Sequence, residues 1–250
     1  MTPSRRATRV RVAAPPLAPC AALLMMLIAL AGCASPPPAG TASPSTSAAA
    51  SAAAVAATAF DDSDYRQARA QGQQVLRIDP QRSLIAINVR RGGTLARFGH
   101  DHVVAARAIE GRVAPQRQRA DFQFRLDQMT VDEAALRTEA GFDTQPSADA
   151  VDGTRTNMLT RVLDAEHYPL VKVHAEGGGD GALTVSITLH GVTRTQTMAV
   201  RMERRDGALT VSGSVNLKQT DFALVPFAVM GGALAVQDQM ELRFRLVAAE

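Results

Sequence analysis

Alternation of apolar and polar residues with a period of two runs through most of the chain beyond residue 75, and this pattern restricts the possible folds more than any other feature. Successive side chains of a β-strand point to opposite faces, so the pattern predicts strands with one buried and one solvated face. Between residues 121 and 127, for example, Phe122, Phe124 and Leu126 alternate with polar residues. The other apolar series are Ile85, Ile87 and Val89; Leu183, Val185, Ile187 and Leu189; Leu209, Val211, Val215 and Leu217; and Met240, Leu242, Phe244 and Leu246.

Glycine-rich turns separate these predicted strands. They lie at residues 92–93, 177–181, 206–207 and 231–232. Glycine adopts the positive φ that tight hairpins require, so the chain is predicted to form an antiparallel meander. Strands with one apolar face bury it either in a sandwich or in a closed barrel, and a barrel also removes exposed sheet edges. The periodicity alone leaves both architectures open.

Helical patterns are few. Thr130 and Glu133 have the spacing of a capping box before the apolar residues 134–136. Residues 155–163 place Met158, Leu159, Val162 and Leu163 on one helical face. An all-β domain with one or two short helices is therefore predicted.

The N-terminus resembles an export leader. Four arginines precede a short apolar run from Cys20 to Ala31, which is too short to span a bilayer. The run ends in Leu30-Ala31-Gly32-Cys33, similar to the bacterial lipobox, so we expect a signal peptide at residues 1–32 and lipidation of Cys33. This predicts a periplasmic lipoprotein anchored in a membrane through Cys33, and Ala34 favours the outer membrane. The alternative is an ordinary secretory leader with Cys33 as a bystander.

The remaining chain divides by composition. Residues 33–59 are almost entirely Ala, Ser, Thr, Pro and Gly, a composition that predicts a disordered tether. Residues 60–74 are a short polar lead-in that forms a helix or stays loose, and residues 75–250 have the length of one domain. Loss of residues 1–32 leaves 23 basic and 24 acidic residues, so nucleic acid is not an expected partner.

The densest polar cluster is Gly99-His100-Asp101-His102. If this stretch is a strand, His100 and His102 point to the same face, about 7 Å apart, a workable spacing for two metal ligands. A third ligand would have to come from His174 or His190. The cluster could instead bind a lipid headgroup with Arg97 or Arg107, or simply satisfy hydrogen bonds at a barrel rim. No motif of a hydrolase, P-loop or dinucleotide enzyme is found in the sequence.

Two segments resemble the YceI-like family of periplasmic, lipocalin-like proteins that bind polyisoprenoid lipids. They are RTNMLTRVLDAEHYPLVKV, residues 155–173, and SITLHGVTR, residues 186–194. The resemblance covers the chain from about Val75 onward and implies an antiparallel barrel with an internal lipid, a helix that plugs or covers it, no cofactor and no catalysis. A metal or redox role for His100 and His102, or a filled barrel that serves as an interaction module, are the alternatives.

Candidate ligand contacts follow from this resemblance. They are His100, His102, Arg155, Met158, Leu159, Phe122 and Phe124. Many family members carry an arginine-aspartate pair and a histidine before the helical leucine, whereas this chain has Arg155-Thr156-Asn157-Met158-Leu159. With the Gly-His-Asp-His cluster, this departure suggests a distinct branch and a different headgroup. The sequence leaves open the ligand, its tail length and the oligomeric state, including a dimer.

Overall fold

The computed structural model describes residues 59–177 and 181–250. The predicted leader, the lipidation site at Cys33 and most of the predicted tether lie outside these residues. Within the described ranges, no helix is both long enough and apolar enough to cross a bilayer.

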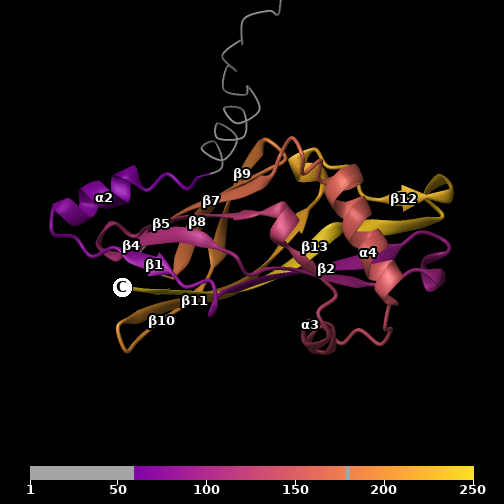
Figure 1. Ribbon diagram of the computed structural model, residues 1–250, viewed down its shortest axis with the longest axis horizontal. Helices are drawn as coiled ribbons and strands as arrows, with labels where there is room; N and C mark the ends of the chain where they lie inside the picture. The colour runs from indigo at the N-terminus through magenta and orange to yellow at the C-terminus, as the bar shows by residue number, and fades with distance from the viewer. Residues whose placement is uncertain (1–58, 178–180) are drawn as a thin grey trace, which may run out of the picture. The chain divides into compact units, whose positions relative to one another are not determined.

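The described chain is mainly antiparallel β-structure with a few short helices, as predicted (Figure 1). The strands are β1 Leu76–Ile78, β2 Leu84–Gly92, β3 His102–Ala106, β4 Glu110–Ala114, β5 Arg119–Arg125, β6 Thr130–Val131, β7 Leu170–Gly177, β8 Ala182–Leu189, β9 Val192–Ala199, β10 Arg201–Arg205, β11 Ala208–Lys218, β12 Ala228–Val229 and β13 Leu234–Ala249. The helices are α2 Ser63–Ala70, α3 Ala134–Glu139 and α4 Ala148–Asn157, and short helical turns include η1 Ala96–Phe98, η3 Leu126–Gln128, η4 Met158–Val162, η5 Thr220–Phe222 and η6 Met230–Gly232.

The sheet closes into a barrel through the long strand β13. One edge of β13 pairs with β2 and then with β1, and the other edge pairs with β11. From β1 the ladder continues through β4, β5, β7 and β8 to β9. Val200 links β9 to β10, which pairs with β11 and so returns the sheet to β13. The barrel, one of the two architectures that the periodicity left open, is thus the observed one.

The predicted apolar series point into the barrel, which confirms the alternation. One inward position on β11 is Gly213, between Val211 and Val215. A Cβ atom at Gly213 would lie 2.9 Å from the ring of Phe244, so this ring occupies the space that a side chain would need. The interruption in the apolar series therefore reflects the close approach of an aromatic side chain.

The helices differ in part from the sequence prediction. The helix predicted at residues 155–163 begins earlier, at Ala148, because the Ser147 hydroxyl accepts a hydrogen bond from the amide of Ala150. It ends in the π-helical turn η4. The predicted capping box before α3 is wrong: Thr130 lies in β6, where its hydroxyl binds the Glu133 carboxylate and caps no helix.

The two ends of the barrel carry different elements (Figure 1). Helix α2, which occupies the lead-in segment, lies at one end, and α4 and β12 lie at the other. Tyr65 of α2 donates a hydrogen bond to Asp121 of β5 at 2.5 Å, which fixes the helix on the barrel wall. The start of the described chain is therefore held at the end of the barrel away from α4.

The turn between β8 and β9 supplies a first test of this architecture. Gly191 has φ +73, and a Cβ atom there would lie 2.9 Å from the Tyr168 ring, which itself contacts the His190 ring at 4.4 Å. Gly191→Ala is expected to lower the free energy of unfolding by roughly 1–3 kcal/mol in urea denaturation. Gly207→Ala is the control, because Gly207 has a similar φ of +76 with no atom within 4 Å of its Cβ position. An equal loss in both variants would contradict a role for the Tyr168 contact.

Candidate lipid-binding cavity

The interior of the barrel holds a cavity of about 450 Å³. Apolar side chains from nearly all the strands, from η4 and from the loop after β11 line it. The volume lies within the range usual for small-molecule sites, about 300–1,000 Å³. The polar side chains in the lining are Arg91, His100, His102, Thr154, Asn157 and Gln219.

These polar residues gather at one end of the cavity. Val89 pairs with His102 and Met240, and Leu217 pairs with Met240 as well, so the end of β2, the start of β3 and the end of β11 lie together. Helix α4 contributes Asn157 to the same lining. We call this end the mouth. The far end is formed by apolar residues only, among them Ala120, Val113, Ala175, Leu209 and Ala248.

The predicted ligand contacts are placed as follows. Phe122, Phe124 and Met158 line the cavity. Leu159 packs against the surrounding apolar core without lining the cavity. Arg155 lies outside the lining, and its guanidinium donates to the backbone carbonyl of Asp127. Arg155 therefore attaches α4 to the turn η3, a role that the sequence did not suggest.

The histidine cluster lines the mouth, but its predicted geometry is partly wrong. Only His102 lies on a strand; His100 precedes β3. The reason is Asp101, whose carboxylate accepts the Arg91 amide at 2.9 Å and replaces the next bond of the β2–β3 ladder. The two imidazole rings still lie close, with centroids 6.2 Å apart in an edge-on arrangement.

A buried ionic network holds His102 in place. Its Nδ1 lies 2.6 Å from the carboxylate of Asp132, and the other oxygen of that carboxylate accepts from Arg137 at 2.6 Å and from the Val103 amide at 3.0 Å. Asp132 and Arg137 have side chains only 1% and 2% exposed. Burial alone would raise the pKa of the Asp132 carboxyl, but the hydrogen bonds from His102 and Val103 lower it below its usual value.

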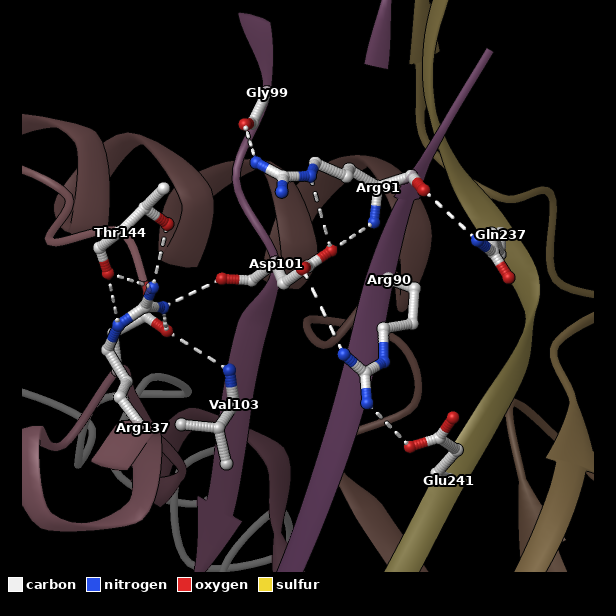
Figure 2. A network of polar contacts seen from close by, with 10 residues as sticks. Arg90, Arg91, Gly99, Asp101, Val103, Arg137, Thr144, Gln237 and Glu241 are labelled. Atoms are coloured by element: carbon white, nitrogen blue, oxygen red, sulfur yellow. Dashed lines mark hydrogen bonds and ion pairs between the residues drawn. The ribbon is translucent and has the colours of Figure 1, made fainter. Parts of the chain in front are cut away.

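The same network fixes the loop before β3, which carries His100. Arg137 also donates to the Asp101 carbonyl at 2.7 Å and binds Thr144 through two guanidinium nitrogens (Figure 2). On the neighbouring strand, Arg91 donates to the Gly99 carbonyl at 3.0 Å (Figure 2). A carboxylate only accepts hydrogen bonds, so Nδ1 of His102 donates to Asp132, and Nε2 is the ring nitrogen left for another partner.

His100 has an unused polar atom at the mouth. Its Nδ1 is buried and has no hydrogen-bond partner. Such a group costs free energy unless it finds a partner, so the mouth offers one unsatisfied polar atom to a ligand.

A three-ligand metal site does not form around these histidines. Among residues 59–177 and 181–250, no group of three or more His, Cys, Asp or Glu side chains is arranged to hold a metal ion. The two candidate third ligands have other contacts: His174 binds Asp121 at 2.6 Å, and the His190 ring packs at an angle against the Tyr168 ring. Neither suggested arginine meets the imidazoles: Arg107 forms two hydrogen bonds to Glu133, and Arg97 stacks on Phe98.

Sequence reasoning missed Asp132 and Arg137, which control the orientation of His102. Asp132 lies 30 residues beyond His102, and only the pairing of β3 with β6 brings it close. Arg137 follows the apolar residues 134–136 but is itself followed by Thr138 and Glu139, so nothing in the local sequence marks it as buried. No periodicity connects the two residues to the histidine cluster.

Comparison with known proteins agrees with this architecture. The family model described as "YceI-like domain" matches residues 76–248. A polyisoprenoid binding domain from Saccharophagus degradans, implicated in plant cell wall breakdown, is similar in structure with a TM-score of 0.50, 12% identity, and coverage of 70% of this chain and 97% of that chain. BcnA from Burkholderia cenocepacia gives a TM-score of 0.45, 14% identity and coverage of 68% and 98%. No match to the chain was found among curated protein sequences.

Proposed function

This chain belongs to the family of YceI-like domains, and on that premise we propose that it binds a polyisoprenoid lipid of the polyprenyl or quinone type and sequesters or carries it without chemical turnover. The observation that carries this proposal is the cavity, which is apolar along its whole length except at the mouth. The similar domain from Saccharophagus degradans is described as polyisoprenoid binding, which supports the same ligand class here.

The shape of the lining suits a linear tail. Along β11 the lining residues run from Leu209 to Leu217, which corresponds to about 26 Å at about 3.3 Å per residue. Transfer of each methylene from water to an apolar site contributes about 0.8 kcal/mol, so a tail of several isoprene units binds tightly with few polar contacts. The tail would occupy the far end and the middle of the cavity.

The headgroup would lie at the mouth, between His100 and His102. Asp132 engages only Nδ1 of His102, which leaves Nε2 for a ligand, and the buried Nδ1 of His100 lacks a partner. A headgroup that carries a hydroxyl can satisfy both imidazoles, because a hydroxyl both donates and accepts. This reading gives the Gly-His-Asp-His cluster a role in headgroup selection without a metal or a cofactor.

We also propose the location in which this binding takes place. The arginine-rich leader and the lipobox-like residues before Cys33 support export to a bacterial periplasm and anchoring by lipid on Cys33, with the outer membrane favoured. Mass spectrometry of organic extracts from residues 60–250, exported to the periplasm without the lipidation site and purified without detergent, tests the ligand. A stoichiometric prenyl lipid is the expected result.

Affinity is expected to depend on tail length. For prenyl ligands with one headgroup, each added isoprene unit should tighten binding by about tenfold or more until the tail fills the cavity, because each unit buries further methylenes. Titration calorimetry measures the series. A series of headgroups on one short tail is the control and should give smaller differences. Equal affinities across the tail lengths would remove the proposed function.

A further inference from the structure

Three exposed apolar side chains surround the mouth. Phe98, Val225 and Met230 are 64%, 77% and 72% exposed, the highest values for large apolar residues in the described part of the chain. We call these three residues the apolar rim. A soluble surface rarely groups such side chains around one opening unless they meet another apolar surface.

The apolar rim is continuous with the cavity lining. Leu95 donates to the Ala233 carbonyl at 2.7 Å, so the loop that carries Phe98 lies beside the turn that carries Met230. One rim residue, Phe98, also lines the cavity. Close neighbours of the other two rim residues in the sequence line it as well, namely Leu224, Phe227 and Leu234. The rim therefore extends the apolar surface of the cavity outward, at the end that carries α4 and β12 (Figure 1).

The sequence around Val225 and Met230 is unusual for a solvent-exposed loop. Residues 222–236 contain no polar side chain. Within this segment Phe222 and Leu224 are buried, but Val225 and Met230 are not. Met230 has φ +52, a conformation uncommon for residues other than glycine, and two glycines follow it in the turn. The turn thus presents a large apolar side chain at its surface.

Basic groups flank this surface. The Arg97 guanidinium lies 4.5 Å from the centre of the Phe98 ring, and that of Arg161 lies 4.9 Å from the centre of the Phe227 ring. Exposed apolar side chains with adjacent arginines are typical of surfaces that enter the boundary between headgroups and acyl chains, where the arginines meet lipid phosphates. A tail that leaves such a bilayer could enter the cavity without crossing water.

We propose that the apolar rim docks on the surface of a bilayer that contains anionic lipids, with Val225 and Met230 inserted and the mouth facing the membrane. The choice of a bilayer, in place of a protein partner, rests partly on the proposed function, because only a lipid cargo requires a continuous apolar route. This contact is separate from the proposed anchor at Cys33, because it is made by the apolar rim around the mouth.

The test uses the protein with Cys20→Ser and Cys33→Ser, so that no other thiol takes a label and no lipid anchor forms, and vesicles of phosphatidylcholine and phosphatidylglycerol that contain no polyisoprenoid. Met230→Cys and, as the matched control, Met202→Cys are labelled with an environment-sensitive fluorophore; Met202 is also exposed, at 45%, but lies on β10. We expect a blue shift and quenching by spin-labelled lipid at position 230 and neither change at position 202. With vesicles of pure phosphatidylcholine, the affinity reported by the label at 230 should be about fivefold lower for each arginine that contacts anionic lipid.

A second variant shows whether the fluorescence change comes from insertion of the apolar rim or from the label itself. Val225→Ser should weaken the binding to vesicles that the label at position 230 reports, on the order of tenfold, because it removes one inserted apolar side chain. Its affinity for a short prenyl ligand in solution should stay unchanged, since Val225 does not line the cavity. A label at 230 that stays in water, or one that shifts without vesicles because a second copy covers it, overturns the proposal. Either result leaves prenyl binding measurable, so the two proposals fail separately.

Discussion

Arg137→Leu is expected to lower the free energy of unfolding by about 3–5 kcal/mol, because it leaves the Asp132 carboxylate buried without its cation. The substitution also removes donors from the Asp101 and Thr144 carbonyls. Breaking a buried pair is costly for this reason: the remaining charge keeps its desolvation cost and loses its compensation. Urea denaturation of the ligand-free protein measures the difference.

Arg125→Leu provides the matched control. Arg125 forms two hydrogen bonds to Asp127 at 2.9 and 2.8 Å, but the two side chains are 36% and 49% exposed. Water compensates the loss of such a pair, so this variant should change stability by only about 0–1 kcal/mol. The double variant Asp132→Ala with Arg137→Leu should cost less than the sum of the two single changes, because it removes both charges. Equal losses for Arg125→Leu and Arg137→Leu would show that burial does not set the strength of the network.

The sequence predicted the barrel wall well. Inward positions such as Ile87, Val185 and Leu217 follow from a period of two, a property of the backbone that neighbouring strands do not change. Closure of the sheet was not predictable from this pattern, because it depends on Val200, where the chain passes from β9, paired with β8, to β10, paired with β11. The resemblance to a known family supplied the barrel where periodicity could not.

The sequence pattern anticipated part of the cavity lining. Phe122, Phe124 and Met158 line the cavity because their inward faces follow from strand or helix period. Arg155 does not, because its long side chain reaches a backbone carbonyl outside the cavity. His100 and His102 were singled out for their composition, but the residues that orient His102 come from a distant segment. Long-range contacts of polar side chains leave no local pattern, so sequence reasoning cannot find them.

Ala120→Trp is expected to weaken binding of a long-tailed prenyl ligand by about 100-fold and to leave a short-tailed ligand unaffected. Ala120 lies at the far end of the cavity, where it pairs with Val113 and Ala175. An indole there would fill the space that the end of a long tail occupies. Exclusion of three or four methylenes, at about 0.8 kcal/mol each, corresponds to about a 100-fold loss.

Two further variants test whether the position of the added indole, and not its size alone, sets the loss of affinity. Thr184→Trp adds the same side chain at an exposed position on β8, outside the cavity lining, and should leave both affinities unchanged. Ala235→Trp places the indole at the mouth, on β13 opposite Gly92, and should weaken short and long tails alike. Retained folding of all three variants is checked by circular dichroism. If Ala120→Trp weakened short and long tails equally, the tail would not enter from the mouth toward Ala120, and the assignment of the headgroup to His100 and His102 would fail with it.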